Sequence, residues 1–543
     1  MSRTTLDWLL HWAEHRPERI FLRQPIGDQV NTWSWAESRD EVLRMAAALA
    51  RYPRGSRIGI TGRNTAHWVL ADLAIAAAGH ISIGFYAKQT TDLVRYIAGH
   101  AGLAAVFVGP MLEQRCVLDG FRPHIDRIRL PYPEVSAERE DWHSLLASHP
   151  PLKLRSPDPD EVWTLVYTSG TTGDPKGVML SFGAATRITT LVQTVLPYRS
   201  DERFFSYLPL AHIFERGSVA GAALASGGCI DFMDSLDRFA EQLRAARPTR
   251  FCAVPLIWQR MQIEVQKQLP AGTGIEQLPE ASQQALLKGL GLDRCYFAVS
   301  GAAPCPTSVL AFFEALGLPI HQGYGMTENF AYVSCNLPGA NRLGTVGRAF
   351  PGVEIRIGEA GEILTRHSGQ MLGYFREPEK SAQVLDAEGW LHTGDLGSLD
   401  AEGYLSITGR IKDQFKTAKG LFVMPIPIEN ALLAHPAIAS ACVIGSGLKA
   451  PVALVNLPPA PVALEVKALR ALLLPLLQQV NAALGAAEQL ARLIVIHEAW
   501  SIDNQLLTPT LKIRRNEMEA RYGALAAAAL AQPEPIVLHG VPP

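Results

Sequence analysis

Short apolar runs alternate with longer amphipathic stretches over the first part of the chain. The run SRIGITGRN (56–64) predicts a buried strand followed by a turn, and TAHWVLADLAIAAAG (65–79) predicts a helix that ends at its glycine. Similar β-rich runs follow at HISIGFY (80–86), LAAVFVG (103–109), EVWTLVY (161–167) and RFCAVPLIW (250–258). Strands that alternate with helices predict an α/β fold with a largely parallel sheet covered on both faces.

The pattern changes near residue 344, where glycine and proline become dense. The alternating runs VEIRIGEAGEILTR (353–366) and GYLSITGR (403–410) predict hairpins of a small β-barrel-like subdomain. After GRIKDQFK (409–416) an α+β region follows, and its Ala-rich end predicts a terminal helix with a loose tail. We therefore predict a large N-terminal domain of layered α/β subdomains over residues 1–410 and a small, mobile C-terminal domain over residues 411–543.

Composition narrows the class of protein. With 543 residues, 48% hydrophobic and 19% charged, the chain is long enough for more than one globular unit. A net charge of −2 gives no indication of a nucleic-acid partner. The seven cysteines form no C-x-x-C pair, which favours a reducing compartment over a zinc site or a disulfide framework.

The sequence also bears on location. The start of the chain lacks the layout of a signal peptide, and the most apolar stretch is interrupted by Asp72, Gly79 and His80. We therefore expect a cytoplasmic protein. Peripheral membrane contact and the choice between monomer and homodimer stay open.

The stretch YTSGTTGDPKGVML (167–180) is the first candidate for chemistry. Gly170 and Gly173 let backbone N–H groups approach an anion closely, hydroxyl side chains add donors, and Lys176 adds a positive charge. The stretch is not a Walker A loop, because Lys176 follows a proline and precedes a glycine. A polar hairpin turn is the plain alternative to a phosphate-binding loop.

The order T-S-G-T-T-G-x-P-K-G resembles the phosphate loop of the adenylate-forming (ANL) superfamily. Six further segments resemble that superfamily in the same order: YLPLAHIFER (207–216), AVSGAAP (298–304), QGYGMTE (322–328), GWLHTGDLG (389–397), GRIKDQFK (409–416) and LTPTLKIRR (507–515). The resemblance covers nearly the whole chain. It implies an enzyme that joins a carboxylic acid to AMP, with pyrophosphate as the leaving group.

The resemblance assigns roles to single residues. It implies that Lys512 is the catalytic lysine, that His212 borders the acid, that Thr168 and Glu328 hold Mg²⁺ and belong to the catalytic set, and that Lys412 is the hinge. The residues that it places at ATP are Ser169, Gly170, Thr171, Thr172, Gly173, Lys176, Gly301, Ala302, Gln322, Gly323, Tyr324, Gly325, Met326, Thr327, Asp395 and Arg410.

Each of these residues also has an ordinary structural explanation. A lone histidine between apolar neighbours is usually a core residue, and a lone glutamate is usually solvated on the surface. The motif MDSL (233–236) is similar to the attachment site of carrier proteins, but we interpret Asp234 or Ser235 as a helix N-cap. The enzyme is therefore expected to use free CoA, with ATP and Mg²⁺.

Within the superfamily, GRIKDQFKTAKGLFVMPIPIEN and YLPLAHIFER are most similar to the long-chain fatty acyl-CoA synthetase branch, and Trp258 falls near the expected acyl tunnel. The implied function is an AMP-forming ligase that joins a medium- or long-chain fatty acid to CoA. One alternative is an acyl- or aryl-AMP ligase that loads a separate carrier protein. A second alternative is a non-catalytic protein that binds acyl nucleotides.

Overall fold

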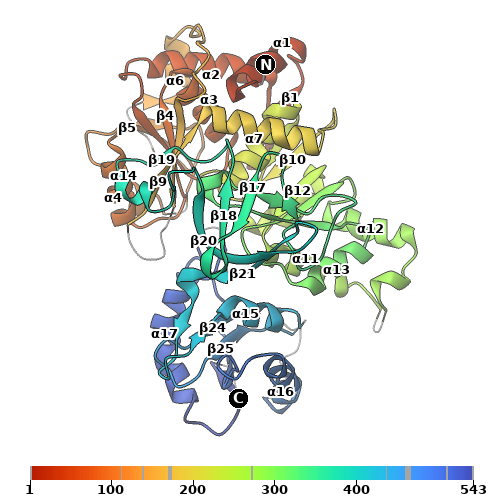
Figure 1. The fold of residues 1–543 in the computed structure, drawn as a ribbon. Coiled ribbons are helices and arrows are strands. Elements are labelled where there is room, and N and C mark those ends of the chain that lie inside the picture. The colour runs from red at the N-terminus through yellow and green to blue at the C-terminus, as the bar shows by residue number, and fades with distance from the viewer. Residues whose placement is uncertain are drawn as a thin grey trace.

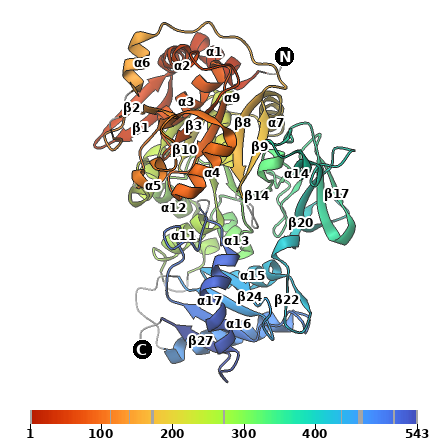
Figure 2. The ribbon, with the colours of Figure 1, turned by 90° about the vertical axis from the view of Figure 1, so that its left-hand side faces the viewer.

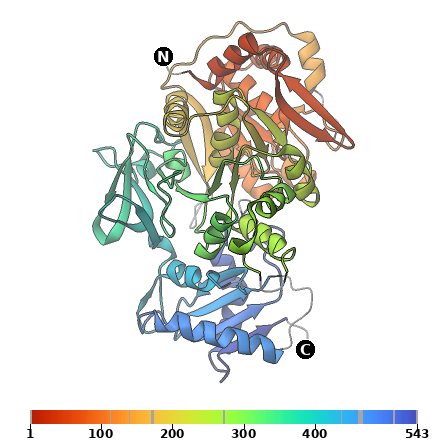
Figure 3. The ribbon, with the colours of Figure 1, turned by 90° about the vertical axis from the view of Figure 1, so that its right-hand side faces the viewer.

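The computed structural model describes residues 3–111, 113–136, 138, 140–168, 174–270, 273–435, 437–458, 466–508 and 511–540. Three sheets with their helices form the upper part of the molecule (Figure 1), and a small antiparallel sheet lies at their side (Figure 2, Figure 3). The last elements of the chain form a separate unit at the lower end, far from the first helix in all three views (Figure 1, Figure 2, Figure 3).

An eight-stranded sheet with the order β19-β9-β8-β4-β3-β5-β6-β7 forms the first layer. Pairing is parallel from β8 to β7, and antiparallel between β19, β9 and β8. The predicted α/β fold with a largely parallel sheet is thus confirmed. The strands are β3 (Arg57–Thr61), β4 (Ile81–Phe85), β5 (Leu103–Val108), β6 (Asp126–Arg129), β7 (Glu140–Asp141), β8 (Val162–Thr168), β9 (Lys176–Ser181) and β19 (Gly373–Tyr374).

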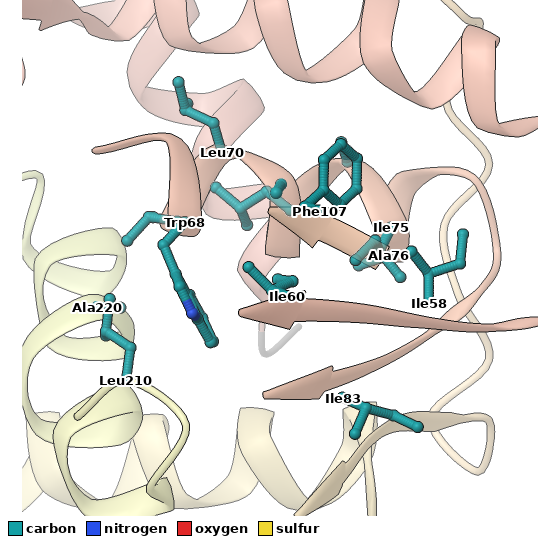
Figure 4. Packing of buried hydrophobic residues seen from close by; sticks show 14 of the residues in the cluster. Ile58, Ile60, Trp68, Leu70, Ile75, Ala76, Ile83, Phe107, Leu210 and Ala220 are labelled. Atoms are coloured by element: carbon teal, nitrogen blue, oxygen red, sulfur yellow. The ribbon is translucent and has the colours of Figure 1, made fainter. Parts of the chain in front are cut away.

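Helix α3 (Ala66–Ala77) is buried on every side, as its continuous apolar sequence predicts. It begins at Thr65, whose side chain accepts a hydrogen bond from the Trp68 backbone N–H at 3.1 Å. Its side chains pack over Ile60 and Phe107 of the sheet (Figure 4). The other helices of this layer are α1 (Thr5–His15), α2 (Trp35–Leu49), α4 (Thr91–Ala101), α5 (Gln114–Leu118), α6 (Trp142–Ser148), α7 (Phe182–Val195) and α14 (Pro378–Ala382).

Two more sheets complete the large part, with the orders β12-β13-β14-β15-β16 and β10-β11-β1-β2. Their strands are β1 (Ile20–Ile26), β2 (Gln29–Ser34), β10 (Arg203–Ser206), β11 (Cys229–Phe232), β12 (Arg250–Ala253), β13 (Phe297–Ser300), β14 (Ile320–Tyr324), β15 (Ser334–Cys335) and β16 (Arg348–Ala349). Their helices are α8 (Ile213–Glu215), the π-helix η1 (Arg216–Gly221), α9 (Ala222–Ser226), α10 (Phe239–Ala246), α11 (Pro255–Gln266), α12 (Glu280–Leu290) and α13 (Thr307–Ala315).

Two local expectations are corrected here. The run 250–258 is a strand only as far as Ala253, because Pro255 begins α11, and proline suits the first turn of a helix. In MDSL, Ser235 does precede a short helix, but its side chain makes no capping bond there. Asp234 instead accepts a hydrogen bond from Arg63 at 2.9 Å.

The predicted hairpins after residue 344 form a four-stranded antiparallel sheet with the order β17-β18-β20-β21. Within the described residues no pairing joins β17 to β21, so the sheet stays open at these edges. Its last two strands carry predicted nucleotide residues. The strands are β17 (Glu354–Ile357), β18 (Glu362–Arg366), β20 (Leu391–Leu399) and β21 (Leu405–Arg410).

The C-terminal part has a sheet of its own, β24-β25-β26-β27, between two separate apolar clusters. The predicted loose tail is wrong over residues 536–539, because β27 pairs in parallel with β26 and buries Ile536 and Val537. Its elements are the hairpin β22 (Phe415–Lys416) and β23 (Phe422–Val423), α15 (Pro425–Leu433), β24 (Ser440–Ile444), β25 (Val452–Asn456), α16 (Val466–Ala482), β26 (Arg492–Ile496), α17 (Arg515–Ala529) and β27 (Ile536–His539). The exact domain boundary after Arg410 stays a prediction.

Candidate active site

A cavity of about 3310 Å³ lies where the large part meets the C-terminal part. Every predicted site residue that the structure describes lines this cavity, although these residues span most of the chain. The predicted phosphate-loop residues Ser169, Gly170, Thr171, Thr172 and Gly173 fall outside the described residues. The predicted residues that line the cavity are Thr168, Lys176, His212, Gly301, Ala302, Gln322, Gly323, Tyr324, Gly325, Met326, Thr327, Glu328, Asp395, Arg410, Lys412 and Lys512.

The phosphate loop joins the two strands of a hairpin, since Thr168 at the end of β8 pairs with Lys176 at the start of β9. The ammonium of Lys176 lies 4.6 Å from the centre of the Tyr374 ring. Burial, and then the charge of Lys412, lower the pKa of Lys176. The flanking residues Thr168 and Lys176 belong to a paired hairpin and both line the cavity, so the hairpin alternative and the predicted phosphate-binding role are compatible.

Glu328 stands in the short helix η4 (Thr327–Asn329) and is only 7% exposed. The hydroxyl of Tyr374 donates a hydrogen bond to Glu328 Oε1 at 2.9 Å. Burial raises the pKa of this carboxyl group. Glu328 is therefore a buried carboxyl group that faces the cavity, and the ordinary explanation of a solvated surface residue does not apply.

The turn after β14 comes unusually close to its neighbour. A Cβ atom at Gly325 would lie 2.3 Å from the carbonyl carbon of Ala331, so only glycine fits there. At Gly323 the space is ordinary, with the nearest atoms 3.6 Å away. Gln322 has a bracing role, because its side chain accepts from Cys305 N–H at 3.1 Å and donates to the Thr345 carbonyl at 3.2 Å.

Asp395 and Arg410 lie opposite each other on β20 and β21. Arg410 Nε donates to Asp395 Oδ1 at 2.6 Å, and the Tyr324 hydroxyl donates to Oδ2 at 2.7 Å. Burial lowers the pKa of Arg410, whereas the charge and the hydrogen bond of the Asp395 carboxylate raise it. The net effect is a raised pKa for Arg410. Each carboxylate oxygen keeps a further lone pair, so Asp395 can still accept from two hydroxyl groups of a ligand.

His212 caps the start of α8 and faces the cavity. Its Nδ1 accepts a hydrogen bond from the Phe214 N–H at 3.2 Å, which leaves the proton of the neutral ring on Nε2. Burial, and then the charge of Lys512, lower the pKa of His212 to about 3. The ring is therefore a neutral hydrogen-bond donor at pH 7.

Lys512 reaches the cavity from the C-terminal part. Its carbonyl accepts from Thr508 N–H at 2.8 Å and its N–H donates to Thr508 Oγ1 at 3.0 Å, which forms a tight turn. The next residue back, Leu511, packs against the apolar cluster around Phe251 and Phe313 in the large part. This packing places Lys512 near Asp395, Arg410 and Glu328 of the large part.

Charged groups of both signs act on Lys512. Lys512 lines the cavity and is solvent-accessible there. The surrounding protein partly desolvates its ammonium group, and this desolvation together with the charge of Arg410 lowers the pKa of Lys512 to about 8. Asp395 and Glu328 act in the opposite direction. A lysine in such a setting is a frequent feature of catalytic sites.

Comparison with known families follows the same two parts of the chain. Residues 9–375 match the AMP-binding enzyme family, and residues 412–533 match the C-terminal domain of AMP-binding enzymes. The chain belongs to the AMP-binding enzyme family. This confirms the resemblance to the adenylate-forming superfamily and identifies the chain as an enzyme of that family.

Curated relatives of this AMP-binding enzyme are named as fatty-acid ligases. The long-chain-fatty-acid–CoA ligase ACSBG2 of Xenopus laevis is 31% identical over 79% of this chain and 66% of the relative. The ACSBG2 of Gallus gallus is also 31% identical, and this chain spans 58% of its length. The long-chain-fatty-acid–CoA ligase FadD15 of Mycobacterium tuberculosis is 28% identical over 94% of both chains.

Solved structures share the fold of this AMP-binding enzyme at lower identity. The anthranilate CoA ligase AuaEII in complex with anthranoyl-AMP superposes with a TM-score of 0.81 at 23% identity, over 97% of this chain and 98% of that one. The adenylation domain of a carboxylate reductase from Mycobacterium chelonae has a TM-score of 0.80 at 23% identity, over 98% and 91% of the two chains.

The donor set of this AMP-binding enzyme fits Mg²⁺. No three His, Cys, Asp or Glu side chains gather as a metal site within the described residues. Glu328 contributes a buried carboxyl group to the cavity wall, and Thr168 contributes a hydroxyl group. Mg²⁺ is often bound by one or two carboxylates with substrate phosphates and water, so such a sparse set suffices.

Sequence reasoning missed Tyr374, and the expectation that Trp258 lies near an acyl tunnel stays a prediction. Tyr374 connects Lys176 with Glu328, but it lies 46 residues from Glu328 and belongs to none of the recognised segments. Trp258 does not line the cavity, because it is fully buried against β13, where its Nε1 donates to the Val299 carbonyl at 3.2 Å. Across the described residues, no helix has both the length and the apolar character needed to cross a membrane.

Proposed function

We propose that this AMP-binding enzyme activates a fatty acid with ATP and transfers the acyl group to CoA. The observation that carries the proposal is the position of Lys512. A lysine from the far end of the chain shares one cavity with Glu328, Asp395 and His212. A protein that only bound nucleotides would not need a lysine with a lowered pKa between the acid and nucleotide segments.

In the first step the fatty-acid carboxylate attacks the α-phosphorus of ATP, and pyrophosphate leaves. His212 donates its Nε2 proton in a hydrogen bond to one carboxylate oxygen and so positions the acid. Charged Lys512 would attract the fatty-acid carboxylate and the α-phosphate to each other and would stabilise the negative charge that builds up on the α-phosphate oxygens during the attack. Asp395 and Arg410 hold the ribose.

Phosphate charge must be neutralised for this attack. Lys176, at the base of the phosphate hairpin, contributes a positive charge next to Tyr374. Thr168 and Glu328 would hold Mg²⁺, which supplies charge neutralisation at the phosphate oxygens when it is bound. Tyr374 holds the Glu328 carboxyl group in place through its hydrogen bond. The protein thus contributes positioning and electrostatics, which are the main requirements of phosphoryl chemistry.

In the second step the CoA thiol attacks the acyl-AMP, and AMP leaves. The names of the curated relatives support CoA as the acceptor. A separate carrier protein stays the alternative acceptor of the acyl group. The anthranilate ligase likewise keeps an aromatic acid open.

A two-part assay tests the proposal. Pyrophosphate exchange is measured with ATP, Mg²⁺ and a panel of aliphatic and aromatic acids, and acyl-CoA formation is then followed with free CoA. We expect exchange with fatty acids and thioester formation with CoA. Exchange without any acyl-CoA would contradict the CoA ligase and favour carrier loading. Exchange with aromatic acids alone would contradict the fatty-acid assignment.

A further inference from the structure

One face of the sheet β12-β13-β14 forms a wall of the cavity. On β12 and the residue after it, Arg250, Cys252 and Val254 line the cavity, whereas Phe251 and Ala253 face an apolar core on the other side. On β13 the same alternation brings Phe297 and Val299 to the cavity. This is the two-residue period of a strand, so the wall follows the strands from end to end.

The length of strand β12 sets how far this wall extends into the protein. The strands are parallel, so their carboxyl ends, at Val254 and Gly301, lie at the same edge of the sheet as the predicted nucleotide residues that follow β13 and β14. The amino ends, at Arg250 and Phe297, are directly paired and lie at the opposite edge of the sheet from Val254 and Gly301. Four residues from Arg250 to Val254 correspond to roughly 13 Å along the strand.

The space next to this wall is apolar. Val192, Val195 and Leu196, from α7 and the residue after it, line the cavity, and Val195 packs with Phe297 in the cluster around Cys335. Tyr332 lines it as well. Side chains of this kind suit the hydrocarbon tail of an acid.

Arg250 occupies the inner end of the wall and is held rigidly. Its Nη2 donates to the Leu196 and Pro197 carbonyls at 2.9 Å each, and its guanidinium lies 4.3 Å from the centre of the Tyr198 ring. Its Nε donates to Glu202 Oε1 at 3.1 Å and to the Tyr296 hydroxyl at 2.6 Å. These contacts join the end of α7 to the start of β12 across the end of the pocket.

The charge of Arg250 is balanced within the protein. The side chain of Arg250 is 6% exposed and that of Glu202 is fully buried, and Glu202 also accepts hydrogen bonds from Thr249 and Tyr296. A buried pair of this kind is costly to break from one side, because the remaining charge is left unpaired. The pair therefore acts as a fixed wall, with Nε and Nη2 of Arg250 bound by the protein.

We propose that Arg250 forms the end wall of the acyl pocket and limits the enzyme to straight-chain acids of about ten to twelve carbons, because an extended alkyl chain advances about 1.3 Å per C–C bond and roughly 13 Å holds about ten bonds. The proposal rests on the proposed function and makes it narrower. It differs from the long-chain acids named for the relatives, and it makes Arg250 a specificity-determining residue.

The first test compares chain lengths in the unaltered protein. Pyrophosphate release is measured with straight-chain acids from butyrate to octadecanoate, and kcat/KM is obtained for each. We expect a maximum near decanoate or dodecanoate and a value for hexadecanoate at least about tenfold lower, since one methylene that does not fit changes discrimination by about 10–200-fold. Equal values for dodecanoate and hexadecanoate would overturn the end wall.

Two variants test the direction of the pocket. Cys252→Phe and Val299→Phe place a ring halfway along the wall, on paired positions of neighbouring strands. Both are expected to lower kcat/KM for dodecanoate at least about tenfold relative to hexanoate, because the tail meets the ring. If either folded variant kept the wild-type ratio of dodecanoate to hexanoate, the acyl chain would not run along this wall.

The wall itself is tested by removing both charges together. The double variant Arg250→Ala with Glu202→Gln is expected to raise the ratio of hexadecanoate to dodecanoate at least about tenfold. The matched control is Arg247→Gln with Asp293→Asn, which removes an ion pair of the same type outside the cavity and should leave the ratio unchanged. An unchanged ratio in the folded Arg250 variant, or a preference of the unaltered protein for α,ω-diacids, would overturn the proposal.

Equilibrium binding separates this proposal from the proposed function. The same acids are titrated into the full chain with AMP present, which needs no turnover. Binding that peaks near ten to twelve carbons without any pyrophosphate release would retain the wall and contradict the ligase. Turnover with no dependence on length would retain the ligase and contradict the wall.

Discussion

Lys512 titrates within the working range of the enzyme, because the cavity lowers its pKa to about 8 from the usual 10.5. Its role requires the charged form, which is present below this pKa and is lost as the pH rises through it. We therefore predict that pyrophosphate exchange falls about tenfold per pH unit well above pH 8. The measurement is the exchange rate between pH 6.5 and 9.5 at saturating ATP and acid.

A matched pair of variants separates charge from structure. Lys512→Arg keeps a positive charge at all these pH values, so its lower activity should show no decline near pH 8. Lys512→Ala should lose pyrophosphate exchange while it still forms acyl-CoA from supplied acyl-AMP. Equal loss of both half-reactions in Lys512→Ala, or the same pH profile in Lys512→Arg, would remove Lys512 from its assigned role.

His321 gives a prediction for stability. It is 4% exposed and stacks on Phe297, and burial lowers its pKa to about 4 from 6.5. Between about pH 6.5 and pH 4, His321 is protonated in the unfolded chain but stays neutral in the folded protein. Protonation therefore favours the unfolded chain, and His321 lowers the stability as the pH falls from 6.5 towards 4. We compare the free energy of unfolding of His321→Phe with that of wild type at each pH. Between pH 7.5 and pH 4, this difference should shift in favour of the variant by up to about 3 kcal/mol.

Denaturant unfolding of the two proteins at several pH values measures this difference. A constant difference in the free energy of unfolding across the whole range would show that His321 is protonated in the folded state, contrary to its burial.

Motif order located most of the candidate site at the residue scale. Glu328, Asp395 and Lys512 were predicted from separate segments, and all three line one cavity. Tyr374 was missed because its contact with Glu328 joins two distant parts of the chain and depends on the pairing of β19 with β9. Such contacts follow from folding and leave no local pattern in the sequence.

At the element scale, the turn after β14 makes the strictest steric demand. Gly325→Ala would place its Cβ 2.3 Å from the backbone of Ala331, so the strand end or the facing turn must move. We predict a loss of about 1–3 kcal/mol in the free energy of unfolding, as for other overpacked sites. Thermal unfolding without ligand measures it.

Gly301→Ala is the matched control, since its Cβ would find its nearest atoms at 3.7 Å. Its stability should lie within about 0.5 kcal/mol of wild type. Similar losses in both variants would mean that the close approach at Gly325 is not what limits substitution there.

Helices and strands with a regular pattern of apolar residues were predicted well. Strands that form only because a neighbouring strand offers a free edge were not predicted. The buried run of α3 and the strands β3 to β5 follow directly from their apolar patterns. The strand β27 was missed because IVLH (536–539) is short and Pro-flanked, and only the free edge of β26 makes it a strand. The break at Pro255 was also overlooked within a continuous apolar run.

At the scale of the whole molecule, Lys412 lies between the large part and the C-terminal part, in the short helix η6 (Ile411–Asp413). Its assigned role as a hinge requires its backbone angles to change between the two half-reactions. Lys412→Pro fixes φ and is predicted to slow acyl-CoA formation at least about tenfold while pyrophosphate exchange stays within about twofold.

Lys412→Ala serves as the control, because it removes the side chain and leaves the backbone free. It should preserve the ratio of the two half-reaction rates. A Lys412→Pro enzyme with both rates intact would contradict the hinge.

Two contacts dock the C-terminal part onto the large part. Lys88 of the large part forms an ion pair with Asp503, and Leu511 packs into the large part next to Lys512. The amino-acid sequence predicted the residues of both parts but not this docking, because surface ion pairs and single apolar contacts carry no recognisable motif. The docked position is what brings Lys512 to Glu328 and Asp395.

The most direct test of the account is product analysis after mixing the protein with ATP, Mg²⁺, dodecanoate and CoA. The account predicts equal amounts of dodecanoyl-CoA, AMP and pyrophosphate from the unaltered protein, and none above background from Lys512→Ala. Release of ADP and phosphate, or the absence of pyrophosphate with every acid from butyrate to octadecanoate, would contradict it.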